Sequence, residues 1–299
     1  MLLDPPASTP TPSAVLDTRP DWFARALAHR PETAECAVDD GVRIRLRAWG
    51  PAGAAEGVLL VHGGGAHAGW WDHVAPLLVD GGRRVVALDL SGHGDSGHRD
   101  RYELDDWADE VAAVVAAGGF GGPPVVVGHS MGGLVALRHG LRHGRAVRGT
   151  IVVDCRTVPY SDAERAANEE RALRPAPVYP DPADALARFR LIPDQRSLPY
   201  VFEHIAATSI RRTPAGWSWK FDPRIFAGQR DFDPLDLGRL AGRLRMVRAE
   251  HGMPAADLSR LDPAVRSVPT VEIPDAGHHV MLDRPLALVA TLRALLATW

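Results

Sequence analysis

The sequence predicts an α/β fold in which a mostly parallel central sheet is flanked by helices. Three short apolar runs that each open into a glycine-rich turn support this class: GVLLVHGGG from Gly57, RRVVALDLSGHG from Arg83 and PVVVGHSMGG from Pro124. Apolar runs of this length are typical of strands buried on both faces, and helical patterns separate them. Strands that alternate with helices indicate a parallel sheet covered on both sides.

The N-terminal part of the chain carries three features before this alternation begins. Residues 1–20 are rich in proline, serine and threonine, so we expect a poorly ordered arm. Asp21 opens a short helical pattern. Residues 36–50 alternate between apolar and polar around Asp40-Gly41, which predicts a β-hairpin with a tight turn.

Strands and helices then alternate as far as about residue 155. In chain order the pattern predicts strand 57–61, helix 70–82, strand 83–90, helix 104–119, strand 125–127, a helix from Leu134 and strand 147–155. The helix over 104–119 begins with acidic residues, which favour a helix N-terminus. These repeated strand and helix units predict one continuous sheet.

The alternation breaks between residues 156 and 237. Helical stretches at 161–174, 181–190 and 197–210 are separated there by proline-rich joints. The pattern resumes with a strand at 244–250, a helix at 254–265, a strand at 268–279 and a helix at 284–299. We therefore predict one core, residues 21–155 and 238–299, interrupted by a helical cap, residues 156–237, that lies over the strand ends.

Composition limits the classes of partner. Of the 299 residues, 45% are hydrophobic and 24% are charged, with a formal net charge of -3, which argues against nucleic acid or an acidic membrane surface. Small neutral or weakly polar ligands fit better. Cys36 and Cys155 show neither metal-type spacing nor a disulfide framework. We see no export signal and no membrane span, so we expect a cytoplasmic protein; the sequence gives no information on oligomeric state.

A serine nucleophile is predicted at Ser130. Gly128-His129-Ser130-Met131-Gly132 fits G-x-S-x-G and lies between a strand and a helix. A side chain at such a junction is held on a sharp, strained turn, where glycines on either side remove collisions. This geometry exposes the hydroxyl above the sheet, close to the free N–H groups of the helix N-terminus.

A serine hydroxyl needs a base that a carboxylate orients, and in this architecture the chain order is serine, acid, histidine. His278 follows the last predicted strand and is our predicted base. We prefer it to His279 because Gly277 allows the turn that would bring its ring back over Ser130. His93 and His129 are interpreted as residues that stabilise loops and turns.

Two carboxylates compete for the role of the acid. Asp154 ends the strand after the serine, and Glu250 ends the strand before the last helix and strand, so both satisfy the chain order. We favour Asp154 because His251-Gly252 follows Glu250, leaving a glycine where an acid on that loop would project. Glu250 remains the alternative.

The negatively charged oxygen formed in acyl transfer needs preorganised N–H donors. Met131 follows the nucleophile, and Gly64 lies in the run HGGG at 62–65 after an earlier strand, so both are predicted oxyanion donors. Phosphate binding by this loop is the less favoured interpretation, because no GxGxxG or Walker pattern accompanies it. Trp217 and Trp219 either pack the cap onto the core, the reading that we favour, or line a substrate pocket.

Together these motifs resemble those of the α/β-hydrolase family. They are HGGG at 62–65, DLSGHGDS at 89–96, GHSMGG at 128–133 and AGHH at 276–279 followed by DRP, in that order. The resemblance covers about residues 36–154 and 238–299. It implies an α/β-hydrolase fold with a cap, and it implies Ser130 as nucleophile, His278 as base and Gly64 and Met131 as oxyanion donors.

The resemblance bears differently on the acid. Members of this family most often carry it after the penultimate strand, where this chain has Ala249-Glu250-His251-Gly252; some carry it after the strand that follows the serine, which is the Asp154 position. The serine also argues against epoxide hydrolases and haloalkane dehalogenases of this fold, because those enzymes use an aspartate nucleophile.

The predicted function is a serine hydrolase that cleaves a small carboxylic ester, lactone or thioester through an acyl-enzyme, with no metal and no organic cofactor. Two alternatives stay open. The same triad could cleave a C–C bond or act as a cofactor-free perhydrolase, or the fold could serve a non-catalytic ligand-binding protein.

Overall fold

The computed structural model describes residues 19–156, 158–228, 238–254 and 267–299. The predicted N-terminal arm lies almost wholly within 1–18, and the predicted helix over 254–265 lies almost wholly within 255–266. Both of these predictions therefore fall outside the described residues.

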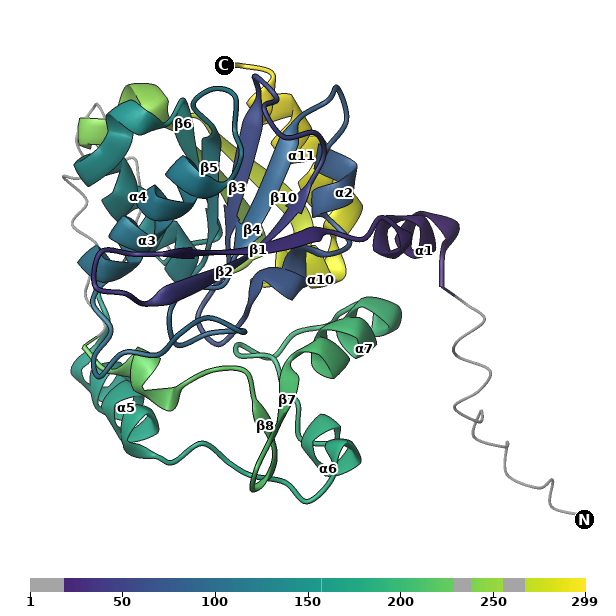
Figure 1. Ribbon diagram of the computed structural model, residues 1–299, viewed down its shortest axis with the longest axis vertical. Coiled ribbons are helices and arrows are strands. Elements are labelled where there is room, and N and C mark those ends of the chain that lie inside the picture. The colour runs from purple at the N-terminus through teal and green to yellow at the C-terminus, as the bar shows by residue number, and fades with distance from the viewer. Residues whose placement is uncertain (1–18, 157, 229–237, 255–266) are drawn as a thin grey trace, which may run out of the picture.

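An eight-stranded sheet forms the centre of the molecule (Figure 1), in the order β1-β2-β4-β3-β5-β6-β9-β10. In chain order the strands are β1 Glu32–Ala37, β2 Arg43–Trp49, β3 Gly57–Val61, β4 Arg84–Leu88, β5 Val125–His129, β6 Gly149–Val153, β9 Leu244–His251 and β10 Thr270–Gly277. β1 and β2 form the predicted hairpin, and β2 also runs antiparallel to β4. The other neighbouring strands are parallel. The predicted mostly parallel sheet is confirmed.

Helices cover both faces of the sheet. α3 Leu104–Ala117 and α4 Met131–His143 lie on one face, and α2 Ala75–Leu78 and α11 Pro285–Leu296 lie on the other (Figure 1). Alternate residues of β3 enter two separate cores: Val58 and Leu60 pack with α2 and α11, and Leu59 and Val61 pack with α3 and α4. The remaining core elements are α1 Asp21–Ala28, α10 Val280–Asp283 and the short turns η4 Gly144–Ala146 and η6 Ala241–Arg243.

The helix predicted over 70–82 is shorter than expected. The structure divides this region into a one-turn helix, η3 Ala68–Trp71, and α2 Ala75–Leu78. Pro76 stands in the first turn of α2, and a proline has no N–H to extend a preceding helix. None of the helices within the described ranges is long and apolar enough to cross a membrane.

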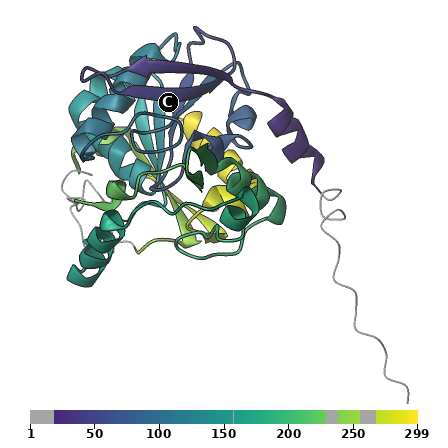
Figure 2. The ribbon, with the colours of Figure 1, turned by 60° about the horizontal axis from the view of Figure 1, so that its bottom comes forward.

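Between β6 and β9 the chain leaves the sheet, where the sequence predicts the insertion. The described part contains α5 Asp162–Leu173, α6 Pro182–Leu186, α7 Pro199–Thr208 and the turn η5 Pro223–Phe226. These elements lie together at one end of the sheet (Figure 1), with α5 and α7 on opposite sides of that layer (Figure 2). The insertion is not wholly helical, because β7 Ile210–Thr213 and β8 Gly216–Trp219 form an antiparallel hairpin that the helical periodicity did not reveal.

Candidate active site

Ser130 lies at the junction between β5 and α4, with backbone angles of φ 54° and ψ -123°. A positive φ is uncommon for a residue with a side chain, and here the neighbouring glycines permit the turn. A Cβ on Gly128 would lie 2.1 Å from the Gly132 carbonyl oxygen, and a Cβ on Gly132 would lie 2.3 Å from the His62 carbonyl oxygen. The motif thus packs backbone against backbone beneath the Ser130 hydroxyl.

His278 follows β10 and approaches Ser130 from above the sheet. Its Nε2 lies 2.9 Å from Ser130 Oγ, and its Nδ1 lies 2.7 Å from Asp154 Oδ2. A carboxylate can only accept, so His278 Nδ1 carries the proton and Nε2 presents a lone pair to the Ser130 hydroxyl. The structure therefore brings together the predicted nucleophile, the predicted base and the favoured acid.

Asp154 is buried directly after β6 and is held by the end of β9 and by the loop that follows it. Its Oδ1 accepts from the Ala249 N–H at 3.0 Å, and its Oδ2 accepts from the Met253 N–H at 2.9 Å. A Cβ on Gly252 would lie 2.1 Å from Asp154 Oδ1, so the glycine makes room for this carboxylate. An aspartate at the end of β6 thus reaches the space above β9.

Glu250, the alternative acid, is exposed on β9 and is directed elsewhere. Its Oε2 accepts from the Asp275 N–H at 2.8 Å. The structure does not bring it to His278, whose Nδ1 already donates to Asp154.

The predicted oxyanion donors lie on the side of Ser130 that faces the cavity. Met131 is the first residue of α4, so its N–H has no partner within the helix. A Cβ on Gly64 would lie 3.5 Å from Met131 Sδ, which brings the two residues into contact distance. His62 supports the glycine loop: its Nε2 accepts from the Leu90 N–H at 3.1 Å and its Nδ1 donates to the Gly63 carbonyl at 2.8 Å. Burial lowers the pKa of His62 to about 4, so its ring is neutral at pH 7.

Two further histidines hold the loop that carries His278. His129 Nε2 donates to the His278 carbonyl at 2.9 Å, and burial, followed by the proximity of His278, lowers the pKa of His129 to about 3. His279 Nε2 lies 3.2 Å from the Ile192 carbonyl, and its backbone N–H donates to Gln195 Oε1 at 2.6 Å. His279 therefore connects this loop to the insertion, a contact that the sequence analysis missed.

A cavity of about 320 Å³ opens beside Ser130 between the core and the insertion. Its apolar lining includes Leu104, Trp107, Leu134, Ile225 and Phe226. A space of this size suits a small ligand, because ligand pockets measure about 300–1,000 Å³.

Trp217 and Trp219, offered as a possible substrate wall, are not among the residues that line this cavity. Trp217 pairs through its backbone with Tyr179, and the Trp219 ring lies against the rings of Tyr179 and Phe189. Both tryptophans lie on the same face of β8, and Trp219 packs against the hydrophobic cluster that contains residues of the insertion and of the sheet core. The sequence analysis did not anticipate the aromatic wall that Trp107 and Phe226 provide.

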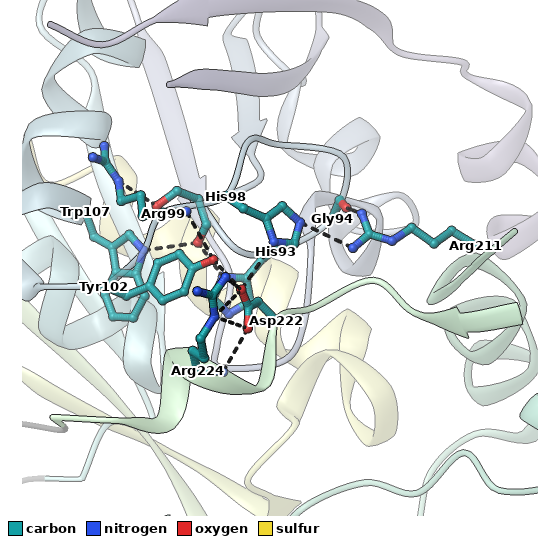
Figure 3. Close-up of polar contacts among 10 residues, drawn as sticks. His93, Gly94, His98, Arg99, Tyr102, Trp107, Arg211, Asp222 and Arg224 are labelled. Atoms are coloured by element: carbon teal, nitrogen blue, oxygen red, sulfur yellow. Dashed lines mark hydrogen bonds and ion pairs between the residues drawn. The ribbon is translucent and has the colours of Figure 1, made fainter. Parts of the chain in front are cut away.

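The Asp222 carboxylate ties the η5 wall of the cavity to the core (Figure 3). It accepts from the Tyr102 hydroxyl at 2.9 Å, from His98 Nδ1 at 3.3 Å and from Arg224 at 2.6 Å. Burial opposes its ionisation, but these hydrogen bonds, that of Arg224 above all, hold the pKa of Asp222 well below its ordinary range. Its backbone N–H also donates to the Gly92 carbonyl at 2.8 Å, so the end of the insertion is fixed to the loop after β4.

Two groups of side chains within the described residues have a spacing that a metal ion could use. They are His129, His278 and His279, and Glu250, His251 and Asp275. In the first group both ring nitrogens of His278 are already bonded to Asp154 and Ser130, so an ion would displace those contacts. The second group is exposed on the surface. The expectation of no metal and no cofactor stays a prediction.

The chain resembles known hydrolases over most of its length. A family model described as the alpha/beta hydrolase family matches residues 58–292. The chain is 30% identical to the esterase Rv0045c of Mycobacterium tuberculosis over 266 residues, which are 84% of this chain and 85% of that protein. It is 38% identical to a monoacylglycerol lipase of Mycolicibacterium smegmatis over 110 residues, 34% of this chain and 39% of the lipase.

A solved structure supports the fold independently. The thioesterase domain from the curacin biosynthetic pathway superposes with a TM-score of 0.71 and covers 88% of this chain and 99% of its own. At 23% sequence identity this similarity supports the fold and not a function.

Proposed function

The chain belongs to the alpha/beta-hydrolase family, and from that premise we propose that it is a serine-dependent hydrolase of carboxylic esters, lactones or thioesters. The similarity to an esterase and to a lipase supports a hydrolase of this family. The observation that carries the finer proposal is the chain of hydrogen bonds from Asp154 through His278 to Ser130, at 2.7 and 2.9 Å.

In the proposed reaction Ser130 Oγ attacks the substrate carbonyl carbon while its proton passes to His278 Nε2. The C–O or C–S bond to the leaving group then breaks, and His278 returns the proton to that group, which leaves an acyl-enzyme. Water attacks the acyl carbon while His278 takes its proton; the bond from that carbon to Ser130 Oγ then breaks, His278 returns the proton to Oγ, and the carboxylic acid leaves. Asp154 stabilises the imidazolium that forms in each half of the reaction.

The tetrahedral intermediate places a negative charge on the former carbonyl oxygen. We assign the backbone N–H groups of Gly64 and Met131 to that oxygen, with support from the N-terminus of α4. Such donors act strongly because they are oriented before the reaction begins. The bonds that His62 makes to the glycine loop would preserve this orientation.

The insertion would act as the cap of this site. Residues of α5, η5 and the segment around Pro193 line the cavity opposite the Ser130 side. We keep the division into core residues 21–155 and 238–299 and cap residues 156–237 as part of the proposal. A cap in this position limits the size of the substrate and restricts the access of bulk water, while leaving room for the single water molecule that hydrolyses the acyl-enzyme.

The proposal is tested by measuring the hydrolysis of p-nitrophenyl esters, from acetate to octanoate. The wild type is compared with Ser130→Ala and His278→Gln. We expect saturable turnover by the wild type and a loss of about 10⁴- to 10⁶-fold in kcat for each variant. Variants that retain wild-type turnover would exclude the assignment. Peracid formation from acetate and hydrogen peroxide, and cleavage of a diketone, are measured in parallel, and preferred turnover in either would favour that rival.

A further inference from the structure

The charged side chains that line the cavity do not balance one another. Among its described lining residues, Arg156, Glu164 and Arg171 carry formal charges at pH 7. Arg156 donates to the two Glu164 oxygens at 2.9 and 3.1 Å, which neutralises that pair. Arg171 therefore leaves one positive charge in the wall of the cavity.

Arg171 reaches the cavity from α5. Glu164, Asn168 and Arg171 lie at helical spacing on one face of this helix, and all three line the cavity. The Arg171 guanidinium carbon lies 4.9 Å from the centre of the Phe226 ring. Within the part of the chain that the structure describes, we find no carboxylate paired with this half-buried guanidinium, whereas Arg174, directly after the helix, pairs with Glu170 at 2.6 Å.

The contact with Phe226 does not satisfy the guanidinium. A cation over the face of an aromatic ring contributes about 0.5–1 kcal/mol at exposed sites, and the ring accepts no conventional hydrogen bond of the kind a carboxylate does. No hydrogen bond from its five N–H donors to another described residue is seen, and these donors form a fork that matches a carboxylate. The Arg171–Phe226 pair therefore presents oriented donors without an acceptor from the described chain.

The position of this pair is fixed relative to Ser130. Phe226 lies in η5, whose first turn Asp222 caps by accepting from the Arg224 N–H at 3.0 Å. The Phe226 ring also contacts the glycine loop, where a Cβ on Gly64 would lie 3.7 Å from it. Since Asp222 is bonded to the core (Figure 3), the Phe226 ring and the Arg171 guanidinium beside it form a defined part of the site.

We propose that Arg171 binds a carboxylate at the far end of the substrate, so that the preferred substrates are esters whose acyl chain ends in a carboxylate. This inference rests on the proposed function. The apolar side chains of Leu134, Trp107 and Ile225 would contact the methylene groups between the ester and the carboxylate. The net charge of the chain suggested neutral ligands, but the local charge of the cavity determines which ligand is bound.

Matched methyl esters test this inference. Monomethyl adipate and methyl hexanoate have the same methylene chain and differ in whether it ends in a carboxylate or a methyl group. We expect the wild type to have the higher kcat/KM for monomethyl adipate, and Arg171→Gln to lower the ratio of the two kcat/KM values about 10- to 100-fold, as for loss of a hydrogen bond between charged groups. Arg171→Lys, which keeps the charge without the fork, should be intermediate.

The matched control is Arg174→Gln, at the residue that directly follows α5; it removes a cation that does not line this cavity and should leave the ratio unchanged. A second arm uses 6-acetoxyhexanoate, in which the carboxylate is on the alcohol side; a larger Arg171 effect on this ester would reject the acyl assignment. A wild type that prefers methyl hexanoate, or a ratio that Arg171→Gln does not change, would overturn the inference.

Binding separates this inference from the proposed function. Calorimetric titration of Ser130→Ala with monomethyl adipate, with and without Arg171→Gln, measures how much Arg171 contributes to the affinity in the absence of turnover. If binding depends on Arg171 but the wild type hydrolyses no ester, the carboxylate contact of Arg171 stands and the proposed hydrolase function is rejected. If the wild type hydrolyses esters but binding does not depend on Arg171, the hydrolase function stands and the carboxylate contact is rejected.

Discussion

Asp154→Asn is the substitution whose consequences the structure defines most closely. The Asp154 carboxylate accepts three hydrogen bonds, from His278 Nδ1 at 2.7 Å, the Ala249 N–H at 3.0 Å and the Met253 N–H at 2.9 Å. An asparagine amide has one oxygen and one NH₂ group in the same space. It cannot accept all three bonds in either orientation.

Both orientations of the amide are unfavourable. With its NH₂ group toward His278, the amide donates to Nδ1, so the proton moves to Nε2 and the ring cannot accept from Ser130. With its oxygen toward His278, the NH₂ group faces the Ala249 N–H, and an unsatisfied buried donor costs about 1–3 kcal/mol. We expect kcat to fall about 10⁴-fold, or roughly 5.5 kcal/mol of activation free energy, and the free energy of unfolding to fall as well.

The assay is p-nitrophenyl ester hydrolysis with Glu250→Gln as the matched control. Glu250 is exposed, and among the described residues its side chain accepts from the Asp275 N–H alone, so we expect the kcat of Glu250→Gln to stay within about threefold of wild type, as for other surface substitutions. Urea unfolding of each variant distinguishes lost chemistry from lost folding. A loss of about 10⁴-fold in Glu250→Gln with near wild-type Asp154→Asn would refute the reasoning.

Three further predictions address the cavity wall, the acid sensitivity and the turn at the serine. Asp222→Asn weakens the hydrogen bonds that hold η5 against the core. We therefore expect KM for the longer p-nitrophenyl esters to rise about 3- to 10-fold, with a smaller change in kcat. An unchanged KM would show that Phe226 is held in place without this carboxylate. Burial lowers the pKa of His62 and of His73 to about 4, so below pH 6.5 the unfolded chain binds protons that the folded chain does not. Stability should therefore decrease as the pH falls from 6.5 toward 4, by about 2 kcal/mol per ring at pH 5, and equal urea midpoints at pH 7.5 and 5.0 would contradict this. Gly132→Ala places a Cβ 2.3 Å from a backbone oxygen, so we expect a loss of about 1–3 kcal/mol in unfolding free energy and a lower kcat, whereas a wild-type Tm and kcat would show that the turn can relax.

The parts of the site that arise from local sequence were predictable. The run of β5, the glycines around Ser130 and the helix that follows all lie within a few residues, and their sterics leave one arrangement. Chain order and strand ends also led to His278 and to the preference for Asp154. The structure adds the reason why Gly252 stands where it does, since the Asp154 carboxylate occupies the space that a side chain there would need.

The contacts that the sequence did not reveal join distant segments. Tyr102 and Asp222 are 120 residues apart, and no local pattern marks them as partners. The hairpin that carries Trp217 and Trp219 consists of two four-residue strands, too short for periodicity to distinguish from the helical surroundings. That Arg171 has no carboxylate partner among the described residues became visible only when the partners of the other charged cavity residues were known.

Covalent labelling with a fluorophosphonate, followed by intact mass measurement and peptide mapping, tests the central claim most directly. The reagent forms a bond to a serine oxygen that an adjacent base activates, and fluoride leaves. We predict one adduct per wild-type chain, located on Ser130, and none in Ser130→Ala under the same conditions. An equal adduct in Ser130→Ala, or a wild-type adduct on another residue, would contradict the account.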